Sequence, residues 1–169
     1  MKRILYVLMF VVAAVAMYAE KAVVNPESMI ENTQEGAEAR ILKLCRWYID
    51  NPTYQDSELR QKVAAEILVY AINTKDFSLT LGEPVTGLLE LSPGHSGMED
   101  LLMVYFAGET IYCLEHNLKK NNAASYAYSM ECVMNYYAQK PEHPIASLNK
   151  YLNMDPMKRM EVFEALYNK

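Results

Sequence analysis

The nearest approach to a catalytic motif is the segment GHSGM at positions 94–98. A nucleophile elbow reads Gly-x-Ser-x-Gly and joins a strand to a helix above a multi-stranded sheet. Here Met98 stands where the second glycine is required, and the sequence predicts no such sheet. Ser96 instead opens the pattern Ser-x-x-Glu directly before an apolar run, which is typical of a helix N-terminus. We therefore expect Ser96 to cap a helix.

The histidines show no spacing that is typical of a metal site. His95, His116 and His143 never stand three or four residues apart, and the motif His-Glu-x-x-His does not occur. His116 falls near the predicted C-terminus of a helix, where an imidazole complements the negative end of the helix dipole. The sequence therefore predicts no metal ligand and no cofactor.

The three cysteines all fall within predicted helices beside apolar residues: Cys45, Cys113 and Cys132. A reactive thiol is favoured by a helix N-terminus or by a cation beside it. Arg46 follows Cys45, but adjacent residues do not face each other on a helix. We expect all three to be small core residues, and whether any two form a disulfide stays open. No residue is assigned as catalytic.

Tyrosine is the one unusual feature of the composition, with 13 in the chain. Tyr126, Tyr128, Tyr136 and Tyr137 crowd a single predicted helix. A ring with a polar tip suits half-buried positions between helices, and it also suits binding of sugars or peptides. We expect most of these rings to seal the edges between helices. The alternative is that the four form an interaction surface.

Helical periodicity dominates the elements that must position these residues. Predicted helices cover 34–50, 57–72, 97–116, 122–139, 144–153 and 155–167, with a further short helix over 85–91. The helix over 97–116 is apolar nearly all round between Leu101 and Ala107, which indicates a central helix. Residues 77–81 alternate with period two, and we expect an extended connector there because no partner strand is evident.

The fold class predicted from these elements is all-α. The domain covers residues 34–169 and contains five to six helices, besides the short one over 85–91, and the short extended connector. It is either a single compact bundle or an array of helical hairpins. Two successive hairpins fall short of the roughly three repeats that a stable array needs.

The first 19 residues are typical of a secretory signal peptide. Lys2 and Arg3 precede an uncharged run from Ile4 to Ala19 that ends in small residues. The run of 16 residues is just shorter than the ~17–25 of a membrane-spanning helix, so an uncleaved anchor is the alternative. Cleavage is expected after Ala16 or Ala19, with no nearby cysteine to accept a lipid. Residues 20–33 would then form an exposed leader.

The charge of the exported chain bears on its partners. Loss of two cations with the signal, which contains no acid, changes the formal net charge from −5 to −7. An acidic domain is not attracted to phosphate backbones or to anionic membrane surfaces, so we expect neither nucleic acid nor, after signal removal, membrane as a partner. We expect a periplasmic or extracellular, non-catalytic binding module of the cell envelope with an unknown protein or glycan partner. The alternative is a hydrolase acting on an envelope polymer.

Several short motifs occur together between positions 42 and 137. They are RWY at 46–48, NP at 51–52, Arg60, the stretch 77–81 and MVYFAG at 103–108. In these the chain resembles small exported helical proteins of unassigned function from Bacteroidetes. Tyr70 and the pair at 75–76 stand where those proteins usually carry a second Trp and a Ser-Pro. The resemblance implies export and a helical domain, and it implies no activity, ligand or catalytic residue.

Overall fold

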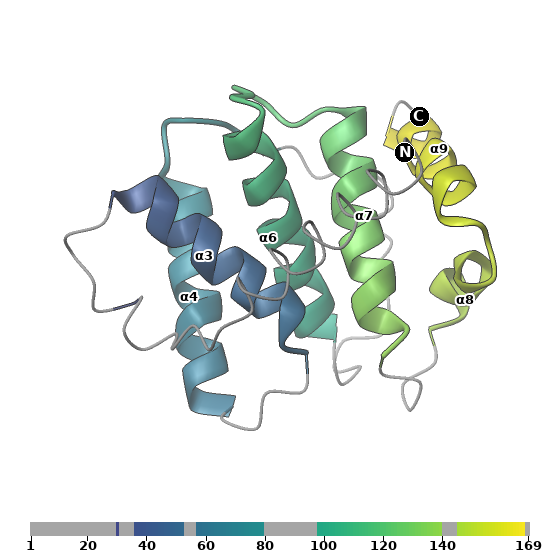
Figure 1. Ribbon diagram of the computed structural model, residues 1–169, viewed down its shortest axis with the longest axis horizontal. Coiled ribbons are helices and arrows are strands. Elements are labelled where there is room, and N and C mark those ends of the chain that lie inside the picture. The colour runs from purple at the N-terminus through teal and green to yellow at the C-terminus, as the bar shows by residue number, and fades with distance from the viewer. Residues whose placement is uncertain (1–29, 31–35, 53–56, 80–97, 140–144, 168–169) are drawn as a thin grey trace, which may run out of the picture.

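A computed structural model of the chain describes residue 30 and residues 36–52, 57–79, 98–139 and 145–167 (Figure 1). These contain six α-helices: α3 (Ala37–Asp50), α4 (Ser57–Asn73), α6 (Met98–Glu115), α7 (Ala123–Tyr137), α8 (Ala146–Leu152) and α9 (Pro156–Tyr167). The domain is therefore all-α, as predicted. The predicted signal peptide, most of the leader, the short helix over 85–91, Ser96, His95 and His143 lie outside the described residues.

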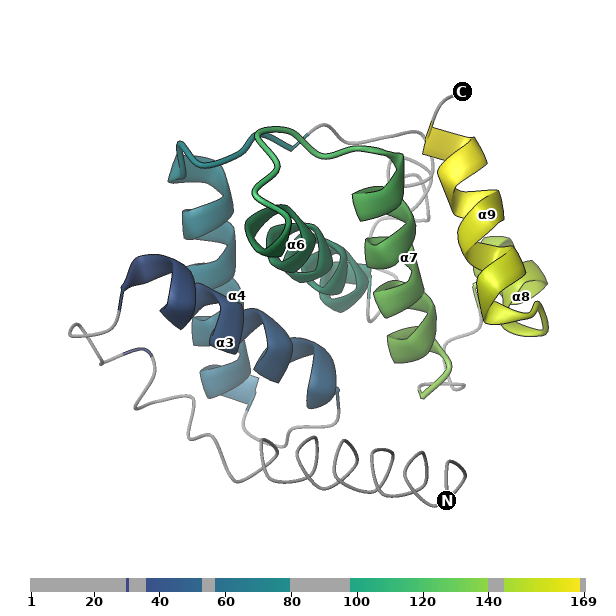
Figure 2. The ribbon, with the colours of Figure 1, turned by 45° about the horizontal axis from the view of Figure 1, so that its top comes forward.

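The helix α6 is central, which confirms the prediction from its apolar circumference. It packs against α3 and α4 on one side and against α7 on the other, and α9 covers the far side of α7 next to α8 (Figures 1 and 2). Buried side chains therefore lie on several sides of α6, among them Val104, Tyr105, Thr110 and Cys113. A helix surrounded in this way has no solvent-facing stripe, so its sequence shows no amphipathic period.

Local sequence signals set the ends of these helices. The α3 helix stops at Asp50, and the N–H of Asn51 donates to the carbonyl of Trp47 just before Pro52. Asn122 and Ser125 form a reciprocal capping box at the start of α7, with bonds of 3.0 and 2.9 Å. Each predicted helix boundary that falls within the described residues lies within two residues of the observed one.

The last helix begins as its Asp-Pro pair predicts. Asp155 accepts hydrogen bonds from the N–H groups of Met157 and Lys158 at 3.0 and 3.2 Å, and Pro156 occupies the first helical position. Arg159 forms a bidentate ion pair with Glu131 of α7, in which the Nε atom of Arg159 lies 2.6 Å from Oε2 of Glu131. This pair and the fully buried Phe163 attach α9 to the bundle.

The extended connector has a partner that the sequence did not reveal. Phe77 is buried, and Ser78 forms an isolated parallel bridge with Lys120 in the turn between α6 and α7. The N–H of Ser78 donates to Lys119, and the N–H of Asn121 donates to Ser78, at 3.0 and 3.1 Å. Asn117 lies in this turn just after the end of α6, and its backbone has a positive φ of 53°. One bridge is not a sheet, and the fold class is unchanged.

Candidate functional site

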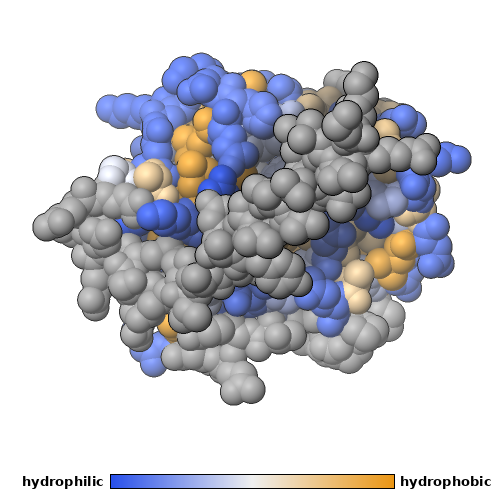
Figure 3. Space-filling view, viewed as in Figure 1, coloured by the Kyte–Doolittle hydropathy of each residue, from blue (hydrophilic) through white to orange (hydrophobic). Residues whose placement is uncertain are grey.

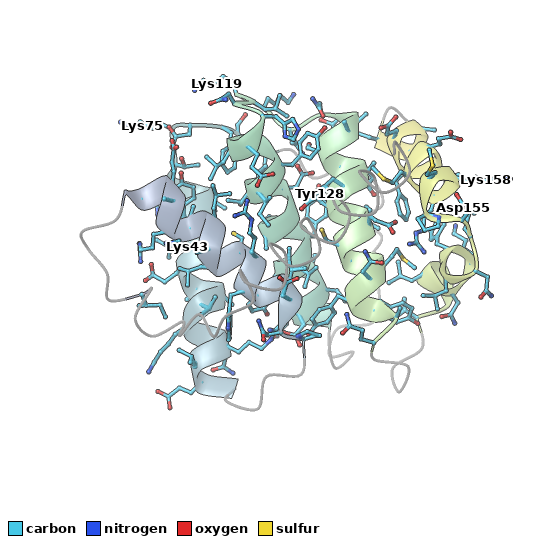
Figure 4. All side chains as sticks on the ribbon, viewed as in Figure 1. Lys43, Lys75, Lys119, Tyr128, Asp155 and Lys158 are labelled. Atoms are coloured by element: carbon cyan, nitrogen blue, oxygen red, sulfur yellow. The ribbon has the colours of Figure 1, made fainter. Side chains whose placement is uncertain are left out.

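The structure separates the four tyrosines of α7. Tyr126, Tyr136 and Tyr137 are buried, because α6 covers one side of α7 while α8 and α9 cover others. Tyr136 donates to Asp100 at 2.9 Å, and Tyr137 donates to Asn149 at 2.8 Å. A buried ring cannot contact a partner. Of the four tyrosines predicted as an alternative interaction surface, Tyr128 is the one that is half-buried, between α6 and α7 (Figure 4).

Tyr128 belongs to a different aromatic cluster that three helices bring together. Its ring lies 5.4 Å from that of Tyr112 on α6, and Tyr112 stacks on His116 with 4.0 Å between centroids and 11° between ring planes. Beside these rings, Arg46 of α3 forms an ion pair with Glu115 of α6. We call these five residues the aromatic face. His116 and the ion pair are exposed, and the two tyrosines are half-buried.

Part of the aromatic face was visible in the sequence. Tyr112 and His116 are four residues apart on one helix, and such residues lie on the same side. The imidazole Nδ1 lies 3.0 Å from the carbonyl of Tyr112, one of the last in α6, which agrees with the expected role of His116 at a helix C-terminus. Arg46 and Glu115 are 69 residues apart, so no local pattern predicts their pairing.

The cysteine thiols are poor nucleophiles in this fold. Cys45 and Cys113 are buried, which confirms their predicted core role, and Cys132 is partly buried beside Tyr128. Burial raises the pKa of Cys113 and that of Cys132 each to about 12, and it raises the pKa of Cys45 as well. The attacking species is the thiolate, and at neutral pH these groups stay protonated. All three are free thiols.

A second polar cluster lies where four helices meet. The carboxylate of Asp100, in the first turn of α6, accepts hydrogen bonds from Tyr48 at 2.8 Å and from Tyr136 at 2.9 Å. Arg60 of α4 lies 3.4 Å from the same carboxylate, and its guanidinium stacks 3.7 Å from the ring centroid of Tyr48. The guanidinium also donates to the carbonyl of Asn51 at 2.8 Å. This Asp100 cluster joins α3, α4, α6 and α7.

The interactions of the Asp100 cluster hold helices together. Burial, followed by the effect of Asp100, raises the pKa of Tyr48, although Arg60 opposes the shift. Tyr48 therefore remains a neutral hydrogen-bond donor, and the carboxylate of Asp100 is already occupied by two hydroxyls and a cation. Each oxygen of this carboxylate is therefore held by a hydrogen bond from another helix. The geometry favours positioning of helices over proton transfer.

Two further observations concern the described residues only. Within them, no three His, Cys, Asp or Glu side chains gather closely enough to hold a metal ion. Among their helices, none has both the length and the apolar character that crossing a bilayer requires. Comparison of the chain with protein-family models, with curated proteins and with solved structures finds no match.

Proposed function

We propose that this chain is an exported, non-catalytic binding module of the cell envelope that binds a protein or glycan partner through the aromatic face. The observation that carries the proposal is the ordered ring series from Tyr128 through Tyr112 to His116 across two packed helices. Rings have few torsions to fix on binding, so they contribute contact area at a small entropic cost. Support on rigid helices keeps the rings ordered before a partner arrives.

The rim of the aromatic face suits a polar partner. The side chains of Arg46 and Glu115 are 53% and 37% exposed, and each neutralises the other. An exposed ion pair contributes at most about 1 kcal/mol to stability. The side chains of Arg46 and Glu115 can therefore separate and bind a ligand at a small cost in free energy. Hydrophilic side chains also dominate the described part of the surface in Figure 3. These features favour a partner that carries hydrogen-bonding groups beside an apolar surface.

The envelope location in this proposal rests on the N-terminus. Lys2 and Arg3, the uncharged run and the small residues at its end are the features that a secretory signal requires. N-terminal sequencing of the protein recovered from outside the cytoplasm is expected to begin at Met17 or Glu20. Recovery of the chain only in the membrane pellet with an intact N-terminus would support the anchored alternative instead.

Binding is tested by retention of a partner from envelope extract on the immobilised protein. Tyr112→Ala and His116→Ala are each expected to weaken retention at least tenfold, because loss of a central aromatic contact typically costs more than 1.4 kcal/mol. Met157→Ala is the matched control, since this side chain is 78% exposed on α9 and lies outside the aromatic face. Circular dichroism verifies that each variant is folded.

The same experiment separates the two classes of partner. Pretreatment of the extract with protease removes a protein ligand, whereas periodate oxidation destroys a glycan ligand. Equal retention by the wild-type protein and by both aromatic-face variants would overturn the proposal, whichever pretreatment abolishes binding.

A further inference from the structure

Glu109 is a carboxyl group fully enclosed in the protein. It lies on α6, and its side chain has an exposed fraction of 0%. Its Oε1 accepts hydrogen bonds from the hydroxyl of Tyr105 at 2.7 Å and from the side-chain amide of Asn121 at 3.3 Å. Its Oε2 is buried with no hydrogen-bond partner among the described residues. The hydroxyl of Tyr126 is also buried and also has no partner among them. Half of this carboxyl group is therefore unsatisfied.

The titratable groups around Glu109 would not stabilise a negative charge. Tyr105 and Cys113 are on α6 itself, Tyr126 is on α7 and Tyr167 is on α9, and each interacts electrostatically with Glu109. All four are neutral when protonated and become anions when they lose a proton. The described residues place no cation against this carboxyl. An ionised carboxylate in such a site would be buried without a counter-charge.

Glu109 is connected to two other parts of the fold through Asn121. The side chain of Asn121 donates to Glu109, and its backbone N–H donates to Ser78 of the connector at 3.1 Å. Its carbonyl accepts from the hydroxyl of Tyr167, near the end of α9, at 3.0 Å. The rings of Tyr126 and Tyr167 lie 5.6 Å apart. A change at Glu109 therefore reaches the connector bridge and the C-terminal end of α9 by direct contacts.

We propose that Glu109 is a neutral carboxylic acid in the folded protein and a pH-sensitive latch, which on losing its proton to solvent loosens the turn at Asn121 and the end of α9. This inference does not depend on the proposed binding function. Burial raises the pKa of Glu109, and the hydrogen bonds from Tyr105 and Asn121 oppose the shift only in part. The direction of the shift agrees with the enclosure and with the surrounding groups.

The sign of the pH effect follows from linkage. Because the pKa of Glu109 is higher in the folded than in the unfolded chain, the folded state binds the proton more tightly. Its contribution to stability is complete below the unfolded pKa of about 4.3 and decreases as the pH rises toward the folded value. Within this window the folding equilibrium constant falls by up to tenfold per pH unit.

The test compares urea unfolding of the wild-type protein and the Glu109→Gln variant between pH 5 and pH 9. Gln has nearly the same shape and cannot ionise, so the variant isolates the proton on this one group. We expect the stability of the wild type, relative to the variant, to decrease as the pH rises. Glu161→Gln on the exposed side of α9 is the control, and it should leave the wild-type pH dependence unchanged. Parallel curves for wild type and Glu109→Gln would overturn the proposal.

A second measurement uses the wild-type protein alone and so does not depend on folding of the variant. The carboxyl carbon of Glu109 in ¹³C-labelled protein is expected to show the chemical shift of a protonated acid at neutral pH. Amide hydrogen exchange at the end of α9, corrected for its intrinsic pH dependence, should accelerate in step with the titration of that carbon. A carboxylate signal at neutral pH, or exchange in α9 that does not follow the titration, would contradict the latch.

Discussion

At the residue scale, Gly108 sets how closely α6 and α7 approach. A Cβ atom at this position would lie 2.9 Å from the Cα of Ser129, which is closer than van der Waals contact permits. Backbone cannot move aside as the end of a flexible side chain can, so only glycine fits. Ser129 and Ser125, one turn before it on α7, are likewise small and buried. This close approach is what encloses Glu109 between the helices.

Gly108→Ala is therefore expected to destabilise the protein, although alanine is the better helix former by about 1 kcal/mol. The overpacking at Ser129 should outweigh that gain and leave a net loss of about 1–3 kcal/mol in the free energy of unfolding, measured with urea. Ala65→Gly on the exposed side of α4 is the control, and it should lose only the ordinary helix propensity. A variant Gly108→Ala as stable as the wild type would show that the two helices can separate without cost.

The residue scale is also where prediction from the sequence stops. The cysteines could be placed in the core because their neighbours are apolar, and Asp155-Pro156 marked a helix start by local chemistry alone. The burial of Glu109 could not be predicted in this way, because a glutamate within a helix is expected to face solvent unless the neighbouring helices are known to cover it. Its burial is decided by α7 and α9, which are distant in sequence.

At the scale of elements, a largely buried ion pair adds to the apolar contacts that attach α9 to α7. The side chains of Arg159 and Glu131 are 7% and 17% exposed, and Arg159 also donates to the carbonyl of Tyr151 at 3.2 Å. A paired charge in such a place contributes little net stability, but removal of one partner leaves the other buried and alone. The attachment of α9 therefore depends on both residues being present.

Glu131→Ala is expected to lose about 3–5 kcal/mol in the free energy of unfolding, because Arg159 would keep its charge without a partner. The double variant Glu131→Leu with Arg159→Met should recover most of this loss, since an apolar pair of similar volume needs no desolvation of charge. Urea unfolding of Glu131→Leu, of Arg159→Met and of the double variant measures the coupling between the two sites. Additive losses would contradict a coupled, buried pair.

Elements were predicted more completely than the contacts between them. Helical spacing, caps and proline positions are local, so they placed all six described helices in the sequence. Whether each tyrosine of α7 is buried depends on which helices cover its side of α7, and the spacing on one helix does not contain that information. The bridge from Ser78 to Lys120 was missed for the same reason, because a single pairing leaves no repeated pattern.

At the scale of the whole molecule, two polar clusters lie between the helices in different roles. The Asp100 cluster is fully hydrogen-bonded around a carboxylate with a cation beside it, and it joins α3 and α4 to the centre. The site of Glu109 has no cation and joins the centre to α9 through Asn121. The aromatic face lies over α3, α6 and α7, on helices that the Asp100 cluster also joins.

Photo-crosslinking in cells measures most directly whether the aromatic face binds a partner. A photo-reactive derivative of phenylalanine at position 116 of the chain, which keeps an aromatic ring at the exposed end of the ring series, is expected to give one dominant adduct that is lost with Tyr112→Ala. The same group at position 157, on the exposed side of α9, should give no such adduct. Equal adducts from both positions, or none from position 116, would contradict binding at this face.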